Sequence, residues 1–301
     1  MKKTLILLAA SAAFALHGPP AQAQAENTRL TVFVSILPQA YFLERIGGDR
    51  VRVEVLVGEG QSPHTYEPTP QQMARLHEAK AWFLIGVPFE RHLAQKLRSD
   101  GSGPVFVETQ KGVPLRTLEK HDRGQNRHEG TGGHAEHGAG TRDPHIWMSP
   151  RLVKIQARNI CEALIRIDPA SREPYLKNLQ SFLTDLDRVD ARIARSLAPV
   201  KGRTMYVFHP AFGYFADAYG LIQAPVEIEG KEPGARQLAA LIDRAKKDKV
   251  RVIFVQPQFS SKTAGVVAKA IGGAVVPINP LAKEYLANLE SMASAVEQGL
   301  R

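Results

Sequence analysis

Short apolar runs alternate with amphipathic segments from residue 30 to residue 108. Such runs are typical of buried strands, and apolar positions recurring every three to four residues predict helices. The predicted strands cover about 30–36, 51–57, 81–86 and 104–108. The predicted helices between them cover about 38–47, 70–79 and 89–98. Strand–helix units of this kind build a parallel sheet, so we expect one four-stranded α/β lobe here.

The same alternation returns after Pro199. The strands predicted there cover about 204–208, 221–228, 250–255 and 274–278. The helices cover about 211–219, 235–247, 262–271 and 284–298. The expected fold class is therefore α/β, with two four-stranded parallel-sheet lobes joined by a long rigid helix. No sequence repeat relates the halves, so their symmetry is one of architecture.

Two helical segments separate these halves, from Pro150 to about Ile167 and from Pro174 to about Leu197. The second has one apolar stripe, formed by Tyr175, Leu179, Phe182, Leu186, Val189 and Ile193. At the α-helical rise the stripe is about 30 Å long, enough to brace two lobes. We expect a first lobe over 26–170, including a His-rich loop at 119–142, a linking helix over 171–200, and a second lobe over 201–301.

Residues 1–25 have the pattern of a signal peptide. Met1-Lys2-Lys3 precedes an apolar run from Thr4 to Leu16 that is too short to span a bilayer, and small residues follow at positions suited to cleavage. No cysteine near that site could carry a lipid, so a free periplasmic protein is expected. Cys161, the only cysteine, is predicted to be a buried thiol.

The net charge and the composition of the loop at 119–142 say less about the function. The net charge is +9 at pH 7, but the basic residues are spread through helices, so we expect no nucleic-acid partner. The loop at 119–142 is poor in apolar residues and contains His121, His128, His134 and His137. These histidines either hold zinc loosely near a binding site or belong to a soluble spacer.

Three other histidines lie in proline-stiffened loops, at His64, His145 and His209. Ligands of parallel α/β sheets bind beyond the carboxyl ends of the strands; His64 and His209 each follow a predicted strand, and His145 lies in the crossover after the fourth. We therefore expect all three in the cleft between the lobes, together with Asn279 after the last strand. Ser149 is expected to cap the helix that follows His145, with Pro150 at its first position.

Three imidazoles without a carboxylate favour zinc over manganese, because Mn²⁺ prefers oxygen ligands. Manganese remains possible. Imidazole must be deprotonated to bind a metal, so affinity is expected to fall below about pH 6.5, the value of a free histidine.

The segments Pro63-His64-Thr65-Tyr66-Glu67-Pro68, Asp143-Pro144-His145-Ile146-Trp147-Met148-Ser149-Pro150 and His209-Pro210-Ala211-Phe212-Gly213-Tyr214 resemble three histidine motifs of one family. That family is the ZnuA/TroA-like, cluster A-I group of zinc and manganese substrate-binding proteins of ABC importers. The resemblance covers essentially the whole chain after residue 25. It implies a buried metal site between the lobes, His64, His145 and His209 as ligands, and delivery of the ion to an inner-membrane ABC permease. We expect a monomer that is not an enzyme.

Asn279 departs from the family pattern, in which an aspartate commonly occupies this position. Three roles stay open for Asn279: it binds the metal through its amide oxygen, it leaves the fourth position to water, or it merely caps the turn into the last helix.

Two other functions compete. A zinc-dependent hydrolase could use His64, Glu67 and His145, although Pro68 follows Glu67 at once and no second acid suits general acid–base work. A binder of a small organic ligand, or a surface adhesin, is the third possibility. Tyr66, Trp147, Phe212 and Tyr214 lie near the motifs and are expected to shield a metal from water.

Overall fold

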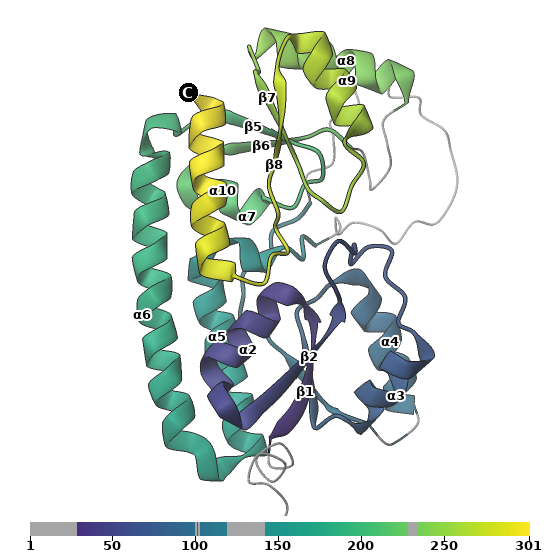
Figure 1. The fold of residues 1–301 in the computed structure, drawn as a ribbon, viewed down its shortest axis with the longest axis vertical. Helices are drawn as coiled ribbons and strands as arrows, with labels where there is room; N and C mark the ends of the chain where they lie inside the picture. The colour runs from purple at the N-terminus through teal and green to yellow at the C-terminus, as the bar shows by residue number, and fades with distance from the viewer. Residues whose placement is uncertain (1–28, 100, 102, 119–141, 228–233) are drawn as a thin grey trace, which may run out of the picture.

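The structure is a computed structural model that describes residues 29–99, 101, 103–118, 142–227 and 234–301. Two α/β lobes lie one above the other, and a pair of long helices runs along one side (Figure 1). Each lobe contains one four-stranded parallel sheet. The expected fold class is confirmed.

The first sheet has the strand order β2-β1-β3-β4. Its strands are β1 (Leu30–Ile36), β2 (Val51–Val57), β3 (Ala81–Leu84) and β4 (Val105–Glu108). The helices of this lobe are α2 (Leu37–Gly47), α3 (Pro70–Glu78) and α4 (Pro88–Ser99). Alternate residues of β1 face different cores: Val32 and Val34 belong to the large core, whereas Phe33 packs in the smaller core that includes residues of α3 and α4. Apolar residues on both faces explain why this strand is a continuous apolar run.

The second sheet repeats this arrangement in the order β6-β5-β7-β8. Its strands are β5 (Thr204–Val207), β6 (Ile222–Pro225), β7 (Val252–Val255) and β8 (Ala274–Pro277). Helices α7 (Gly213–Tyr219), α8 (Ala235–Lys247), α9 (Ser261–Ile271) and α10 (Tyr285–Leu300) complete the lobe. Gly220 ends α7 in the left-handed conformation, which a glycine adopts without steric cost.

Helices α5 (Pro150–Ile167) and α6 (Arg172–Leu197) connect the two lobes. The short 3-10 helices are η1 (Gly48–Arg50), η2 (Ile146–Met148), η3 (Pro169–Ser171) and η4 (Ala198–Val200). Helix α6 has 26 residues, a length of about 39 Å at the α-helical rise. Five residues of the predicted stripe are buried, and Leu179 is half-buried. One continuous core contains residues of α2, α5, α6 and α10, so it extends through both lobes.

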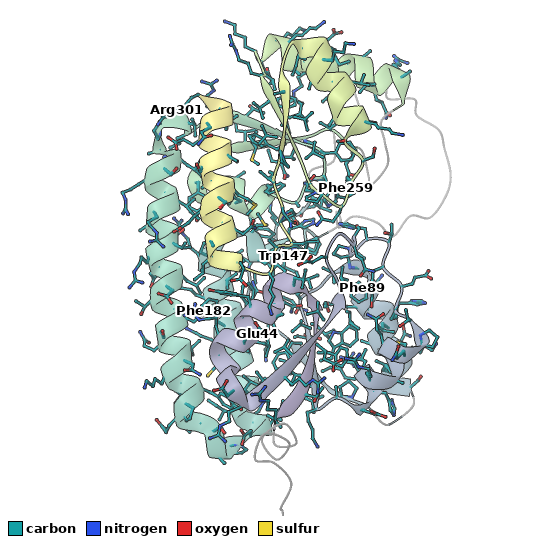
Figure 2. The ribbon with its side chains drawn as sticks, viewed as in Figure 1. Glu44, Phe89, Trp147, Phe182, Phe259 and Arg301 are labelled. Carbon is teal, nitrogen blue, oxygen red and sulfur yellow. The ribbon has the colours of Figure 1, made fainter. Side chains whose placement is uncertain are left out.

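Helix α10, the last helix of the second lobe, packs against the first lobe. Helix α10 lies beside α6 (Figure 1), and the ring of Tyr285 at its start packs edge-on against Phe42 of α2, with ring centroids 4.8 Å apart. The Tyr285 hydroxyl donates a hydrogen bond to the Trp147 carbonyl at 2.6 Å. Trp147 lies at the junction of the lobes (Figure 2). Its indole Nε1 donates to the Pro280 carbonyl at 2.8 Å.

The predicted elements match the observed ones closely. The main differences lie at the ends of strands, such as β6, which covers 222–225 where 221–228 was predicted. Ser149 occupies the N-cap position of α5, but its side chain makes no capping hydrogen bond. Cys161 is buried, as expected. The proposed signal peptide and the four loop histidines lie outside the described residues, and no helix within the described part of the chain is long and apolar enough to cross a membrane.

Candidate metal centre

His64 lies in the loop between β2 and α3. Thr69 and Gln72 form a capping box that fixes the start of α3, and Pro70 occupies the first turn. The His64 amide donates to Ser62 Oγ at 3.3 Å. The residue as a whole is exposed, but its ring nitrogen points toward the opposite lobe, because His64 Nε2 lies 3.0 Å from His209 Nε2.

His145 is buried directly before η2. Asp143, two residues earlier, folds its carboxylate back onto this histidine. Asp143 Oδ1 accepts hydrogen bonds from the His145 amide at 3.0 Å and from the ring Nδ1 at 2.7 Å. The side chain of His145 therefore has a fixed orientation before any metal binds.

His209 lies just beyond β5 in the second lobe and is also buried. Gln256 holds its backbone: the His209 amide donates to Gln256 Oε1 at 3.2 Å, and Gln256 Nε2 donates to the His209 carbonyl at 2.7 Å. The ring Nδ1 lies 2.5 Å from Glu227 Oε1. Phe259 stacks on the imidazole with ring centroids 4.9 Å apart. These contacts hold the backbone through Gln256 and the ring through Glu227 and Phe259.

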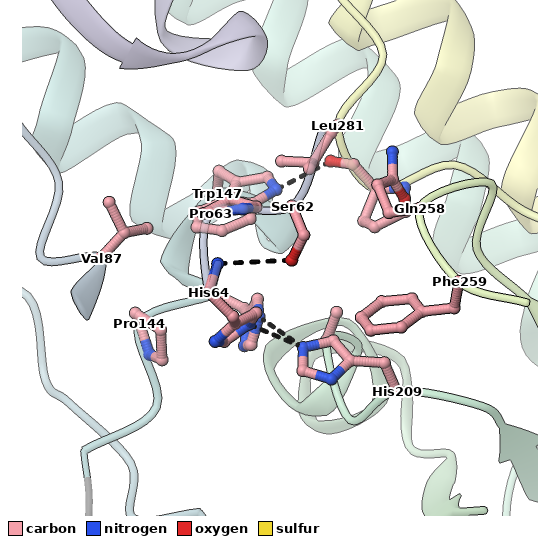
Figure 3. A pocket seen from close by; sticks show the side chains of 13 residues that line it. Ser62, Pro63, His64, Val87, Pro144, Trp147, His209, Gln258, Phe259 and Leu281 are labelled. Carbon is pink, nitrogen blue, oxygen red and sulfur yellow. Dashed lines mark hydrogen bonds between the residues drawn. The ribbon is translucent and has the colours of Figure 1, made fainter. Parts of the chain in front are cut away.

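The three imidazoles converge as predicted, and Figure 3 shows the rings of His64 and His209 facing each other. His209 Nε2 lies 3.3 Å from His145 Nε2, and candidate ligand atoms of all three residues lie within 4.8 Å of one another. Nitrogens that bind one tetrahedral Zn²⁺ at 2.0–2.1 Å lie about 3.3 Å apart. The donor set and its spacing therefore fit a single divalent ion.

The surroundings keep two of these rings neutral. Desolvation of the ring, together with the neighbouring imidazoles of His209 and His145, lowers the pKa of His64 from 6.5 to about 3. Burial also lowers the pKa of His209, against the opposing effect of Glu227. Neutral imidazole is the form that binds metal, so protons compete only weakly with a metal ion for these two rings.

A pocket surrounds the histidines at the junction of the lobes. Both lobes line it, with Ser62, Pro63, His64, Val87, Pro144, His145, Trp147, His209, Ala211, Gln258, Phe259, Pro280 and Leu281. Of the aromatic residues expected to shield the site, only Trp147 lines this pocket; its ring lies 5.2 Å from that of His145. Phe259, which the sequence analysis did not single out, lines it from the second lobe.

Asn279 does not line the pocket. Its Oδ1 accepts hydrogen bonds from the Leu281 amide at 3.0 Å and from Gln258 Nε2 at 3.1 Å. The first of these is the turn-capping contact that the sequence allowed as one role. The second positions Gln258, which does line the pocket.

The described residues do not form the arrangement that a hydrolase using His64, Glu67 and His145 would need. Glu67 is exposed, and the metal-capable group identified within the described residues comprises His64, His145 and His209 without it. Sequence reasoning missed the roles of Asp143 and Glu227. Asp143 was visible as a neighbour of His145, whereas the contact of Glu227 with His209 depends on the pairing of β5 with β6.

Comparison with known proteins agrees with this geometry. Residues 32–299 match the family model described as ZnuA, zinc-uptake complex component A, periplasmic. The chain is 30% identical over 262 residues to the high-affinity zinc uptake system protein ZnuA of Bacillus subtilis, covering 86% of this chain and 81% of the relative.

Two solved structures are also similar. A crystal structure of ZnuA superimposes with a TM-score of 0.81 at 40% identity, covering 91% of this chain and all of the other. A ZnuA deletion mutant with zinc bound gives a TM-score of 0.80 at 39% identity, covering 90% and 98% of the two chains. With its two matching lobes and its convergent histidines, the chain belongs to the ZnuA family of periplasmic zinc-uptake components.

Proposed function

We propose that this protein binds Zn²⁺ with high affinity in the periplasm and delivers it to an ABC permease in the inner membrane. The convergence of three imidazole nitrogens from two lobes carries the proposal. His64 and His145 come from the first lobe and His209 from the second, so a bound ion would join the lobes. The family supports the same role, since relatives are named as zinc-uptake components.

His64, His145 and His209 are the proposed ligands. For the fourth position we favour water, because Asn279 Oδ1 already accepts two hydrogen bonds. A carbonyl oxygen has two lone pairs, so binding through Asn279 would break one of these contacts. Nitrogen ligands also favour zinc over manganese as the cargo.

Zinc titration tests the ligand assignment. His64→Ala, His145→Ala and His209→Ala should each weaken zinc binding at least 100-fold, because loss of an outer-shell partner alone costs about 10–100-fold. The matched control is His92→Ala, since His92 is an exposed histidine of α4 away from the pocket. Binding that is unchanged in two of the three site variants would reject the shared site.

Asn279→Ala separates the roles of that residue. Loss of a turn-capping hydrogen bond should lower the free energy of unfolding by about 1 kcal/mol. Zinc affinity should change by only a few-fold if water fills the fourth position. Urea unfolding and zinc titration of the same variant distinguish the two, and a 100-fold loss of affinity would make Asn279 a ligand.

We propose a carrier and not an enzyme, acting as a monomer. Zinc-loaded protein should show no peptide or ester hydrolysis above that of His64→Ala, and light scattering should give the mass of one chain. We also propose that residues 1–25 act as a signal peptide, which mass spectrometry of the mature protein from periplasm would test.

A further inference from the structure

Two buried carboxylates lie behind the histidine cluster, one from each lobe. Asp143 and Glu227 are 1% and 3% exposed. Neither lines the pocket, yet each contacts the Nδ1 atom of a pocket histidine, Asp143 that of His145 and Glu227 that of His209. Within the described residues no carboxylate makes the same contact with His64.

These contacts fix which ring nitrogen carries the proton. A carboxylate only accepts hydrogen bonds, so Nδ1 of His145 and Nδ1 of His209 must each donate. In the neutral ring the lone pair is then on Nε2. The two Nε2 atoms face each other at 3.3 Å, where two lone pairs repel unless a cation lies between them. The carboxylates therefore hold both rings in the metal-binding tautomer.

The same carboxylates supply charge that the ligands lack. Three neutral imidazoles leave a bound divalent ion with its full +2 charge in a largely buried pocket, which is unfavourable without compensation. Asp143 and Glu227 together provide two negative charges one imidazole away from the ion. Arg116 offsets part of this, with Nε 3.9 Å from Asp143 Oδ2, but it also pairs with Asp217 of α7 at 3.5 Å.

We propose that Asp143 and Glu227 are positioning residues for the zinc site, fixing the tautomers of His145 and His209 and balancing the charge of the ion. This inference rests on the proposed function and extends it to residues that do not touch the metal. It also assigns the compensating charge to the outer carboxylates, because the amide of Asn279 carries none.

Zinc titrations of Asp143→Asn and Glu227→Gln test the proposal. Each should bind zinc about 10–100-fold more weakly than the wild type. The matched control is Asp168→Asn, whose carboxylate accepts a hydrogen bond from the Tyr175 hydroxyl and touches no histidine of the cluster. Its zinc affinity should equal that of the wild type. Asp143 contacts His145 in the first lobe, and Glu227 contacts His209 in the second. If one variant misfolds, the other still tests the proposal.

A double-mutant cycle separates positioning from a general structural effect. Asp143→Asn should weaken zinc binding less in a His145→Ala background than in the wild type, because the ring that it positions is gone. The absorption spectrum of Co²⁺-loaded protein should also change in Glu227→Gln, since it reports the ligand geometry. Equal losses in both backgrounds, with an unchanged Co²⁺ spectrum, would overturn the proposal.

These measurements separate a failure of zinc binding itself from a failure of the role proposed for Asp143 and Glu227. Failure of the wild type to bind zinc would overturn the proposed function and this inference together. Zinc binding that is lost in His209→Ala but unchanged in both carboxylate variants would overturn only the inference.

Discussion

At the scale of single residues, the site combines two buried histidines that have carboxylate partners with one exposed histidine that has none within the described residues. Although the residue as a whole is exposed, the Nε2 edge of His64 faces the cluster, and desolvation and the two other imidazoles keep the ring neutral. The value of a free histidine, about 6.5, therefore overestimates the pH at which protons compete at His64. Burial also lowers the pKa of His209. Zinc affinity should therefore begin to fall at a lower pH than the free-histidine value indicates.

The pKa of His64 predicts a loss of stability in acid for the metal-free protein. Well above pH 6.5 the ring is neutral in both the folded and the unfolded chain, so pH has no effect through this group. As the pH falls from 6.5 toward 3, the unfolded chain binds a proton that the folded site excludes, and the free energy of unfolding decreases.

Thermal unfolding between pH 7.5 and pH 4.5 measures this effect. The melting temperature of the metal-free wild type should fall with pH more steeply than that of His64→Gln, which cannot titrate at this position. The exposed His92→Gln should follow the wild type. Parallel curves for the wild type and His64→Gln would show that this ring is protonated equally in both states.

At the scale of elements, α6 is the principal brace of the molecule. Its side chain Phe182 is fully buried and contacts Tyr41 and Phe42 of α2, with ring centroids 6.0 and 5.8 Å apart. The guanidinium of Arg45 lies 5.2 Å from the Phe182 ring and forms an ion pair with Asp185, one turn further along α6. The helix is therefore held to the first lobe by packing and by charge.

Phe182→Ala should lower the free energy of unfolding by about 3–5 kcal/mol, because it leaves a cavity in the core and removes the aromatic contacts. Urea unfolding at pH 7.5 measures the change. Ser181→Ala, at the neighbouring exposed position of the same helix, should change the free energy by less than about 0.5 kcal/mol. A similar small change in Phe182→Ala would show that α6 is not a brace.

At the scale of the whole molecule, two sets of contacts between the lobes stand out. One is the continuous core that includes residues of α2, α5, α6 and α10. The other is the junction formed by Trp147, Pro280 and Tyr285. The histidine cluster lies beside this junction, so an ion bound there would add a further connection between the lobes.

Zinc should therefore stabilise the whole chain and not one lobe alone. At a free zinc concentration of 1,000 times Kd, binding to the folded state adds about 4 kcal/mol. Calorimetry should show one unfolding transition that moves to higher temperature with zinc and returns with a chelator. Two transitions, of which only one responds to zinc, would place the metal within a single lobe.

The alternation of apolar runs was sufficient to predict the two sheets and α6, because buried strands and amphipathic helices leave strong local periodicities. The three histidines were also predictable, since they follow strand ends or lie in proline-stiffened turns. The cap made by Asn279 Oδ1 was only one of several roles that the sequence allowed. The contact of Glu227 with His209 was not predictable, because those residues meet only when β5 and β6 pair.

The sequence by itself determined the elements, their order and the residues able to bind a metal, because these depend on side-chain chemistry and local spacing. The tertiary structure decided which nitrogen of each ring faces the site, which carboxylates stand behind two of the rings, and how far burial lowers the pKa of His64. It also decided that Phe259, and not Tyr66, lines the pocket. These properties depend on distances between residues far apart in the chain, which no local pattern encodes.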